Sequence, residues 1–191
     1  KLRVRAYDDD PSSPVFLEVK KRSNVVVRKT RARVSREVAE AVLNGRPAAL
    51  SDVEGASEFA LRLDELAARP LVRVRYLREA YESAHGDPVR FTIDTEVEHS
   101  MTSTSNLALE AHREWEPTPT EGAIVELKFS EQCPSWATRL IDQLEINRES
   151  IPKYVLSLDH AMDQGNLSRP RQSQLRHALS ESRRSLRLPN A

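Results

Sequence analysis

Hydrophobic and charged side chains alternate along residues 16–34, and this pattern predicts two consecutive strands joined by a short turn at Ser23 and Asn24. Period-two alternation is typical of strands with one buried face. In the second strand, however, one face carries a row of cations, namely Lys29, Arg31 and Arg33. Because charge on the protected side of a sheet is costly unless a partner or ligand compensates it, we interpret these strands as the wall of a charged cavity.

The same division into an ionic face and an aliphatic face recurs in other predicted strands, at residues 1–7, 88–97 and 123–130. Two further strands are predicted at residues 71–81 and 107–115. Helices are predicted after the N-cap Ser35, where the helix ends at Gly45, and at residues 57–68, 135–148 and 152–165. The helix at 135–148 is expected to bury one apolar side, formed by Trp136, Leu140, Ile141 and Leu144.

The ionic faces allow two interpretations. An antiparallel sheet can expose its polar face to water, which is the simpler one. Closure of the strands around a cavity is favoured because arginine is more common than Ser, Thr and Gln on the ionic faces, and because single acids such as Glu18 and Glu126 occur among cations. Strands joined by short turns can roll into an antiparallel barrel. Since Arg and Lys bind phosphate oxygens and carboxylates hold Mg²⁺ or Mn²⁺, such a barrel would host a phosphate chain and its divalent cation.

The composition excludes some classes of function. The 191 residues include 29 Lys and Arg against 29 Asp and Glu, so the net charge is zero and a general nucleic-acid binder is not expected. The cations are concentrated at the start, because residues 1–36 hold eleven of them and four acids. Cys133 is the only cysteine, which excludes a disulfide framework and a Cys-based zinc site. With no signal peptide and no apolar run of membrane-spanning length, the chain is expected to be cytoplasmic, and its natural start is expected upstream of Lys1.

Seven short motifs occur in a fixed order along the chain. They are Leu-Arg-Val-Arg-Ala-Tyr (2–7), Phe-Leu-Glu-Val-Lys (16–20), Lys-Thr-Arg-Ala-Arg-Val (29–34), Arg-Tyr-Leu-Arg-Glu-Ala-Tyr (75–81), Val-Arg-Phe-Thr-Ile-Asp-Thr-Glu (89–96), Val-Glu-Leu-Lys-Phe (125–129) and Pro-Lys-Tyr (152–154). Together they resemble the VTC domain, the polyphosphate polymerase domain of vacuolar transporter chaperone complexes and their bacterial relatives. The domain is expected at residues 1–167, followed by a Ser- and Arg-rich tail at 168–191.

The resemblance implies an α+β fold in the triphosphate tunnel metalloenzyme, or CYTH-like, superfamily. Its expected core is an antiparallel barrel of about eight strands flanked by helices, with the first strand upstream of Lys1. The implied activity is transfer of the γ-phosphate of ATP onto a growing polyphosphate chain, with Mn²⁺ or Mg²⁺ as the metal. A membrane-protein partner in the full system is also implied.

The resemblance and the ionic faces together give a set of expected site residues. The expected phosphate-binding residues are Arg3, Arg5, Lys20, Lys29, Arg31, Arg33, Arg78, Arg90, Lys128 and Lys153. Of these, the expected catalytic residues are Arg3, Arg5, Lys20, Arg78, Arg90 and Lys153. Glu126 is expected to bind the metal.

Alternatives stay open for several residues. Lys20 could pair with Glu18, and Glu126 could pair with Lys128. The acids at 94 and 96 are expected to hold lining arginines, and the five histidines show no ligand spacing. The whole domain could also be a non-catalytic polyphosphate- or nucleotide-binding module, or a triphosphatase that hydrolyses inorganic or organic triphosphates.

One departure from a regular strand is expected. Arg78 is out of phase with Arg73 and Arg75, so a regular strand cannot point all three inward. A β-bulge near Tyr76 would re-aim the side chains.

Overall fold

The computed structural model describes residues 1–23, 26–83, 89–109, 114–120, 122–130, 132–146 and 149–165. Its strands are β1 (Leu2–Arg5), β2 (Val15–Ser23), β3 (Val26–Val34), β4 (Val72–Glu82), β5 (Arg90–Met101), β6 (Glu116–Pro117) and β7 (Ile124–Lys128). Its helices are α1 (Arg36–Leu43), the 3-10 helix η1 (Pro47–Leu50), α2 (Ser57–Glu65), α3 (Ser135–Gln143) and α4 (Lys153–Asp163). The predicted α+β class is confirmed.

Strands β1, β2 and β3 form an antiparallel sheet in that order, which we call sheet A. One face of sheet A packs on α1, α2 and η1, and its buried side chains there include Val15, Leu17, Val19 and Ala32. The predicted cap of α1 is confirmed, because the Ser35 hydroxyl accepts a hydrogen bond from the Val38 amide at 3.2 Å. The aliphatic face predicted from the alternation is therefore the main core.

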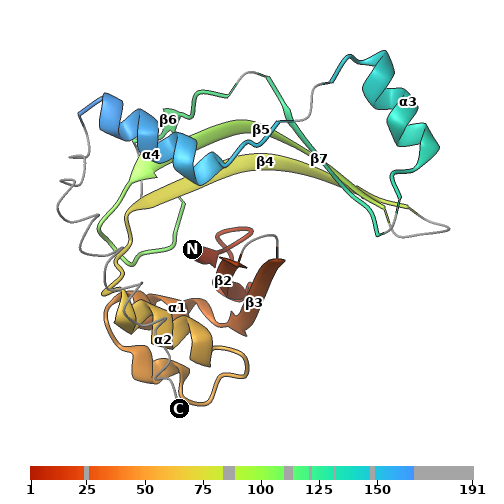
Figure 1. Ribbon diagram of the computed structural model, residues 1–191. Coiled ribbons are helices and arrows are strands. Elements are labelled where there is room, and N and C mark those ends of the chain that lie inside the picture. Colours follow the sequence, from red (N-terminus) through yellow and green to blue (C-terminus); the bar gives the residue numbers. More distant parts are fainter. Residues whose placement is uncertain are drawn as a thin grey trace, which may run out of the picture.

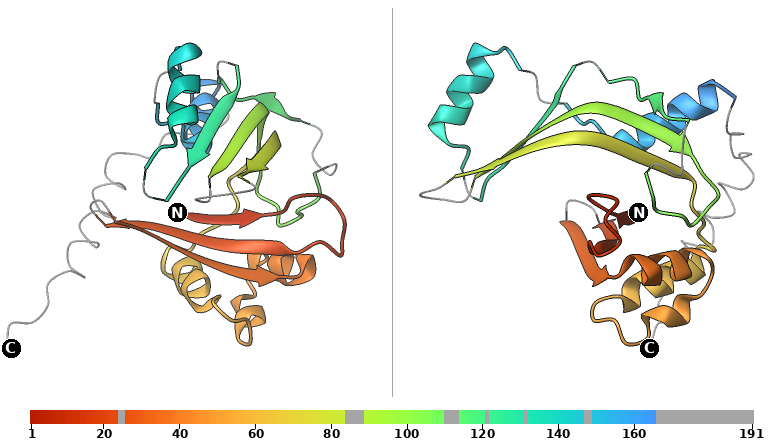
Figure 2. Two further views of the ribbon diagram at one scale, coloured as in Figure 1. Left: turned by 90° about the vertical axis from the view of Figure 1, so that its right-hand side faces the viewer. Right: turned by 180° about the vertical axis from the view of Figure 1, so that it is seen from behind.

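The second antiparallel sheet, which we call sheet B, has the order β4, β5 and β6, with β7 also paired to β5. Sheet B curves over sheet A in all three views (Figures 1 and 2). The strands of the described residues thus form two separate sheets, and closure into one barrel of about eight strands is not confirmed.

The ladder between β4 and β5 is irregular at Tyr76. Two β5 residues, Glu96 and Val97, lie opposite this single β4 residue, and Glu96 has a φ of 50°. The predicted irregularity near Tyr76 is confirmed in its location, but the extra residue lies on β5, so the expected re-aiming of the β4 side chains is not borne out.

The bulge does not bring all three arginines of β4 to one partner. Arg73 donates to the carbonyl oxygen of Ala108 at 3.2 Å, and Arg75 donates to the carboxylate of Glu98 at 2.6 Å. Arg78, beyond the bulge, has a different set of partners, described below.

The prediction of a strand at residues 107–115 is wrong for the part of this segment that the structure describes. The Leu107 amide donates to Glu40 at 3.1 Å, and the Leu109 amide donates to the Asp9 carboxylate at 2.9 Å. Because side chains of distant segments satisfy these backbone groups, the segment is held as an irregular connection and not in a ladder. Residues 110–113 lie outside the described residues.

The prediction that α3 buries an apolar side is also wrong. Trp136 is 46 % exposed and Leu144 is 59 % exposed, and Ala137 is the buried residue of this helix. α3 lies at the right-hand end of sheet B, on the side away from sheet A (Figure 1), and Trp136 lines a surface hollow with Phe129. A helix pattern predicts an apolar stripe but not whether another element covers it.

The remaining predictions concern the end of the chain. The helix predicted at 152–165 is confirmed as α4. The tail at 168–191, and with it the domain boundary, lies outside the described residues. None of the described helices combines the length and the hydrophobicity that crossing a bilayer requires.

Candidate functional site

The face of sheet A opposite its core carries an ordered set of cations, which we call the cationic array. Directly opposed residues of antiparallel strands lie on the same face. The register gives three rows across β1, β2 and β3: Lys1, Lys20 and Lys29; Arg3, Glu18 and Arg31; and Arg5, Phe16 and Arg33. These three rows therefore hold seven cationic side chains and one carboxylate, a formal excess of six positive charges.

Glu18 stands at the centre of the array and is only 3 % exposed. Its carboxylate accepts from Arg3 Nε at 2.7 Å and lies 3.0 Å from Lys29 Nζ. Arg31 Nε lies 3.5 Å from Glu18 Oε1, and Arg5 Nε lies 3.8 Å from Glu18 Oε2. Burial by itself would raise the pKa of Glu18, but the hydrogen bonds from Lys29 and Arg3 outweigh it and hold the pKa below its usual value. One carboxylate thus positions four cations.

The rest of the positive charge in the array is not neutralised within the sheet. Lys20 lies directly opposite Lys29, although like charges at such positions destabilise a strand pair. The pKa of Lys1 is lowered to about 8, by desolvation first and then by the charges of Arg3, Lys20 and Arg5. Both observations indicate a positive potential suited to a polyanion.

A second cluster lies on sheet B around Asp94, which is 1 % exposed. Arg78 binds both carboxylate oxygens, at 2.6 and 2.7 Å, and Lys153 Nζ from α4 lies 2.7 Å away. Burial would raise the pKa of Asp94, but the hydrogen bonds from Arg78 and Lys153 lower it. Asp94 therefore holds a lining arginine in place, as expected from the sequence. Glu96, in contrast, is exposed at the bulge.

Glu126 on β7 lies beside this cluster. Its side chain is 45 % exposed, with Lys128 Nζ at 3.0 Å and Arg78 Nη2 at 4.0 Å. It lies opposite Thr92, whose buried hydroxyl has no hydrogen-bond partner among the described residues. Magnesium commonly binds proteins through one or two carboxylates together with substrate phosphates. A half-exposed carboxylate beside an unpartnered hydroxyl fits that coordination.

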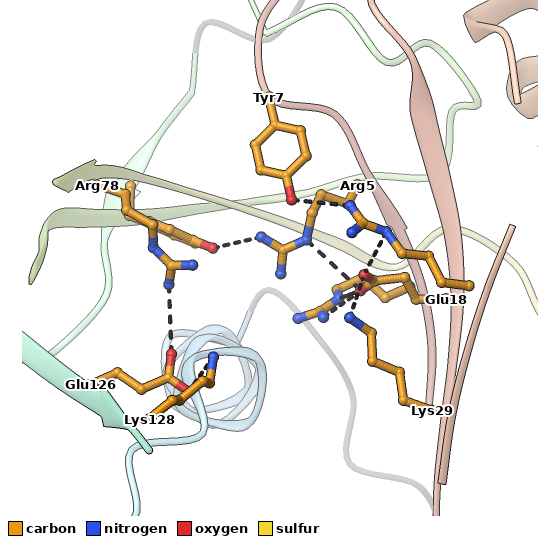
Figure 3. A network of polar contacts seen from close by, with 10 residues as sticks. Arg5, Tyr7, Glu18, Lys29, Arg78, Glu126 and Lys128 are labelled. Carbon is orange, nitrogen blue, oxygen red and sulfur yellow. Dashed lines mark hydrogen bonds and ion pairs between the residues drawn. The ribbon is translucent and has the colours of Figure 1, made fainter. Parts of the chain in front are cut away.

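Tyr76 joins the two clusters. Its hydroxyl accepts from Arg5 Nη1 at 3.0 Å, and its ring centroid lies 5.0 Å from the Arg78 guanidinium and 5.2 Å from Lys153 Nζ. In Figure 3, Arg5 from the array and Arg78 from sheet B both extend into the space between the sheets, where Arg78 points toward Glu126. The cations of the two sheets therefore form one site.

The chain also resembles a known protein family. A family model described as the VTC domain matches residues 1–161. The chain belongs to the VTC domain family. No curated protein and no solved structure matches it. This VTC domain accordingly has a polyphosphate-related function, in a family associated with polyphosphate polymerase activity and with metal-dependent use of polyphosphates or nucleoside triphosphates.

The structure of this VTC domain gathers the expected site residues into the two groups just described. The array contains Arg3, Arg5, Lys20, Lys29, Arg31 and Arg33, and sheet B with α4 contributes Arg78, Arg90, Glu126, Lys128 and Lys153. Arg90 is exposed and lies opposite Lys128, on the face that carries Glu126. Residues that the sequence analysis did not select are Lys1, Tyr76 and Thr92. Two sequence signals pointed to Tyr76, namely the motif at 75–81 that contains it and the bulge expected near it.

Proposed function

We propose that this VTC domain synthesises polyphosphate from ATP by metal-dependent phosphoryl transfer between sheets A and B. The observation that carries the proposal is the cationic array, whose excess of six positive charges faces a second set of cations on sheet B. A linear polyanion is the ligand class that matches a row-by-row arrangement of Arg and Lys.

The array binds and orients the phosphate chain. Arginine forks contact phosphate oxygens bidentately, and the lysines of the first row act as point charges. Glu18 fixes the directions of four cations before the ligand arrives, and its single charge is too small to neutralise them. Binding then needs little reordering of long side chains, which favours affinity.

Sheet B contributes the groups nearest to the transferring phosphoryl group. Asp94 holds Arg78 and Lys153 in place, so both cations are positioned to stabilise charge that develops in the transition state. Glu126, with the Thr92 hydroxyl beside it, would hold the divalent cation. When bound, that cation neutralises charge on the phosphate oxygens.

The first test compares two neighbouring lysines of β2. Lys20→Gln removes one charge from the array, whereas Lys21→Gln removes the same charge from the opposite face, where Lys21 pairs with Glu58 on α2. The domain is incubated with ATP and Mn²⁺, and polyphosphate is resolved on a gel. Lys20→Gln is expected to lower both polymer yield and triphosphate affinity about 10-fold, the effect of one lost charged contact, while Lys21→Gln leaves both unchanged.

The second test separates synthesis from the alternative activities. Glu126→Gln is expected to abolish polymer formation while triphosphate still raises the midpoint of thermal unfolding. A wild-type domain that binds triphosphate but makes no polymer is a binding module, and one that releases orthophosphate is a triphosphatase. A domain to which triphosphate does not bind contradicts the site itself.

A further inference from the structure

A group of metal-ligating side chains lies outside the cationic site, where three elements meet. His99 on β5, Glu116 on β6 and His160 on α4 place their ligand atoms within 4.8 Å of one another. His99 Nε2 lies 3.9 Å from Glu116 Oε2, and the two imidazole rings are 5.3 Å apart and nearly perpendicular. The residues are far apart in the sequence, so no motif spacing could indicate the group.

A chain of hydrogen bonds fixes the tautomer of His99, which is 1 % exposed. The Ser157 hydroxyl donates to the carbonyl oxygen of Lys153 at 2.8 Å, so it accepts from Thr118 Oγ1 at 3.2 Å. Thr118 in turn accepts from His99 Nδ1 at 3.1 Å. Nδ1 therefore carries the proton, and Nε2 is the unprotonated nitrogen, which is the form of the ring that binds a metal. Ligating histidines are commonly oriented by such a second hydrogen bond.

We propose that His99, Glu116 and His160 bind a zinc-type transition-metal ion that joins α4 to sheet B. Two imidazoles and one carboxylate form a donor set that zinc accepts, with water in the fourth position. Magnesium and manganese prefer oxygen ligands, so this site is chemically distinct from the one proposed at Glu126.

The required movement is small. Donors bound to one zinc ion at about 2.0–2.1 Å lie roughly 3.3 Å apart in a tetrahedral site. His99 is the buried anchor, whereas Glu116 and His160 are only partly buried and can approach it by side-chain rotation.

The site has a structural consequence for α4. His160 follows Lys153 by two helical turns, so both side chains lie on the face of α4 that packs on sheet B. A metal bound at one end of this face would hold the helix whose other end places Lys153 against Asp94. The metal site thus links helix position to the cationic site.

The experiment uses the tag-free protein after treatment with a chelator. Co²⁺ is titrated in and the visible d–d absorption of four-coordinate cobalt is followed, and Zn²⁺ is titrated in parallel by calorimetry and thermal unfolding. The wild type is expected to develop the cobalt bands, and Zn²⁺ at roughly 100-fold excess over Kd should raise the unfolding midpoint by about 5–10 °C.

Three variants assign the binding to this cluster. His160→Gln is expected to weaken Zn²⁺ binding at least about 10-fold and to abolish the cobalt bands. Thr118→Val removes the hydroxyl that fixes the His99 tautomer and is expected to weaken Zn²⁺ binding about 10-fold. Asp159→Asn, on the exposed side of α4, is the matched control and should bind as the wild type does. A wild type without cobalt bands, or a His160→Gln variant with unchanged affinity, overturns the proposal.

Discussion

The two faces of sheet A are built from the same strands and serve opposite purposes. Leu17 and Glu18 are neighbours in β2 and are both nearly inaccessible to solvent, at 1 % and 3 %. Leu17 is buried by apolar side chains, whereas Glu18 is covered by the cations that it binds. The apolar face stabilises the fold, and the opposite face gives up stability to concentrate positive charge. A sheet can therefore carry an excess of positive charge on one face when its other face packs into a complete hydrophobic core.

The largest expected effect comes from the apolar face. Leu17→Ala removes a fully buried side chain and should lower the free energy of unfolding by about 3–5 kcal/mol, measured by urea denaturation. Lys20→Ala, on the other face, should change it by no more than about 0.5 kcal/mol. Triphosphate affinity of the folded Leu17→Ala variant should be unchanged. Equal losses of unfolding free energy in both variants would contradict the conclusion that the apolar face stabilises the fold and the cationic face does not.

Acid should remove the contribution of both buried carboxylates. The pKa values of Glu18 and Asp94 are held below their usual 4.5 and 3.8 in the folded state, so the unfolded chain binds more protons as pH falls. Their stabilisation is complete above the usual values and is lost as pH decreases through the lowered folded values. Urea midpoints measured from about pH 6 to about pH 3 should fall accordingly. Midpoints that stay level would contradict the assigned ion pairs.

Removing only the central carboxylate has a smaller effect. Glu18→Gln leaves four cations without their shared partner and should lower the free energy of unfolding by about 1–3 kcal/mol at low salt. Added triphosphate should restore much of the loss, because it supplies the missing negative charge. Glu58→Gln, which breaks the pair with Lys21 on the core side, is the control, and triphosphate should stabilise it only as much as it stabilises the wild type.

The smallest effect concerns the link between the sheets. Tyr76→Phe keeps the ring near Arg78 but removes the hydroxyl that accepts from Arg5, so stability should fall by only about 1 kcal/mol. Triphosphate affinity, measured by calorimetry, should decrease a few-fold because Arg5 loses its orientation. Tyr154→Phe, which keeps the ring beside Lys1, is the matched control. Identical affinities would show that the two sheets bind the ligand independently.

Local patterns predicted a large part of this architecture. The alternation in residues 16–34 gave both faces of β2 and β3, and Ser35 gave the start of α1. The phase of Arg78 relative to its neighbours indicated an irregularity near Tyr76, although the extra residue lies on β5 and not on β4. These predictions succeeded because side-chain direction in a strand and the first turn of a helix depend on a few adjacent residues.

Other features could not be read from the sequence. Trp136 and Leu144 have the pattern of a buried helix face, but none of the elements that the structure describes buries them. His99 and His160 show no ligand spacing, but the packing of α4 on sheet B brings them together. The arrangement of the described strands in two sheets was likewise not predicted, and the expected single barrel is not confirmed. Each of these depends on how distant elements pack.

The sequence by itself determined that cations would line one face of sheet A and that aliphatic residues would line the other, because backbone geometry makes strand side chains alternate. Only the tertiary structure decided that Glu18 would be shared by four of those cations and that Tyr76 would connect them to Asp94. Strand register and the docking of one sheet over another are set by contacts between distant residues, and a one-residue slip would have changed every partner.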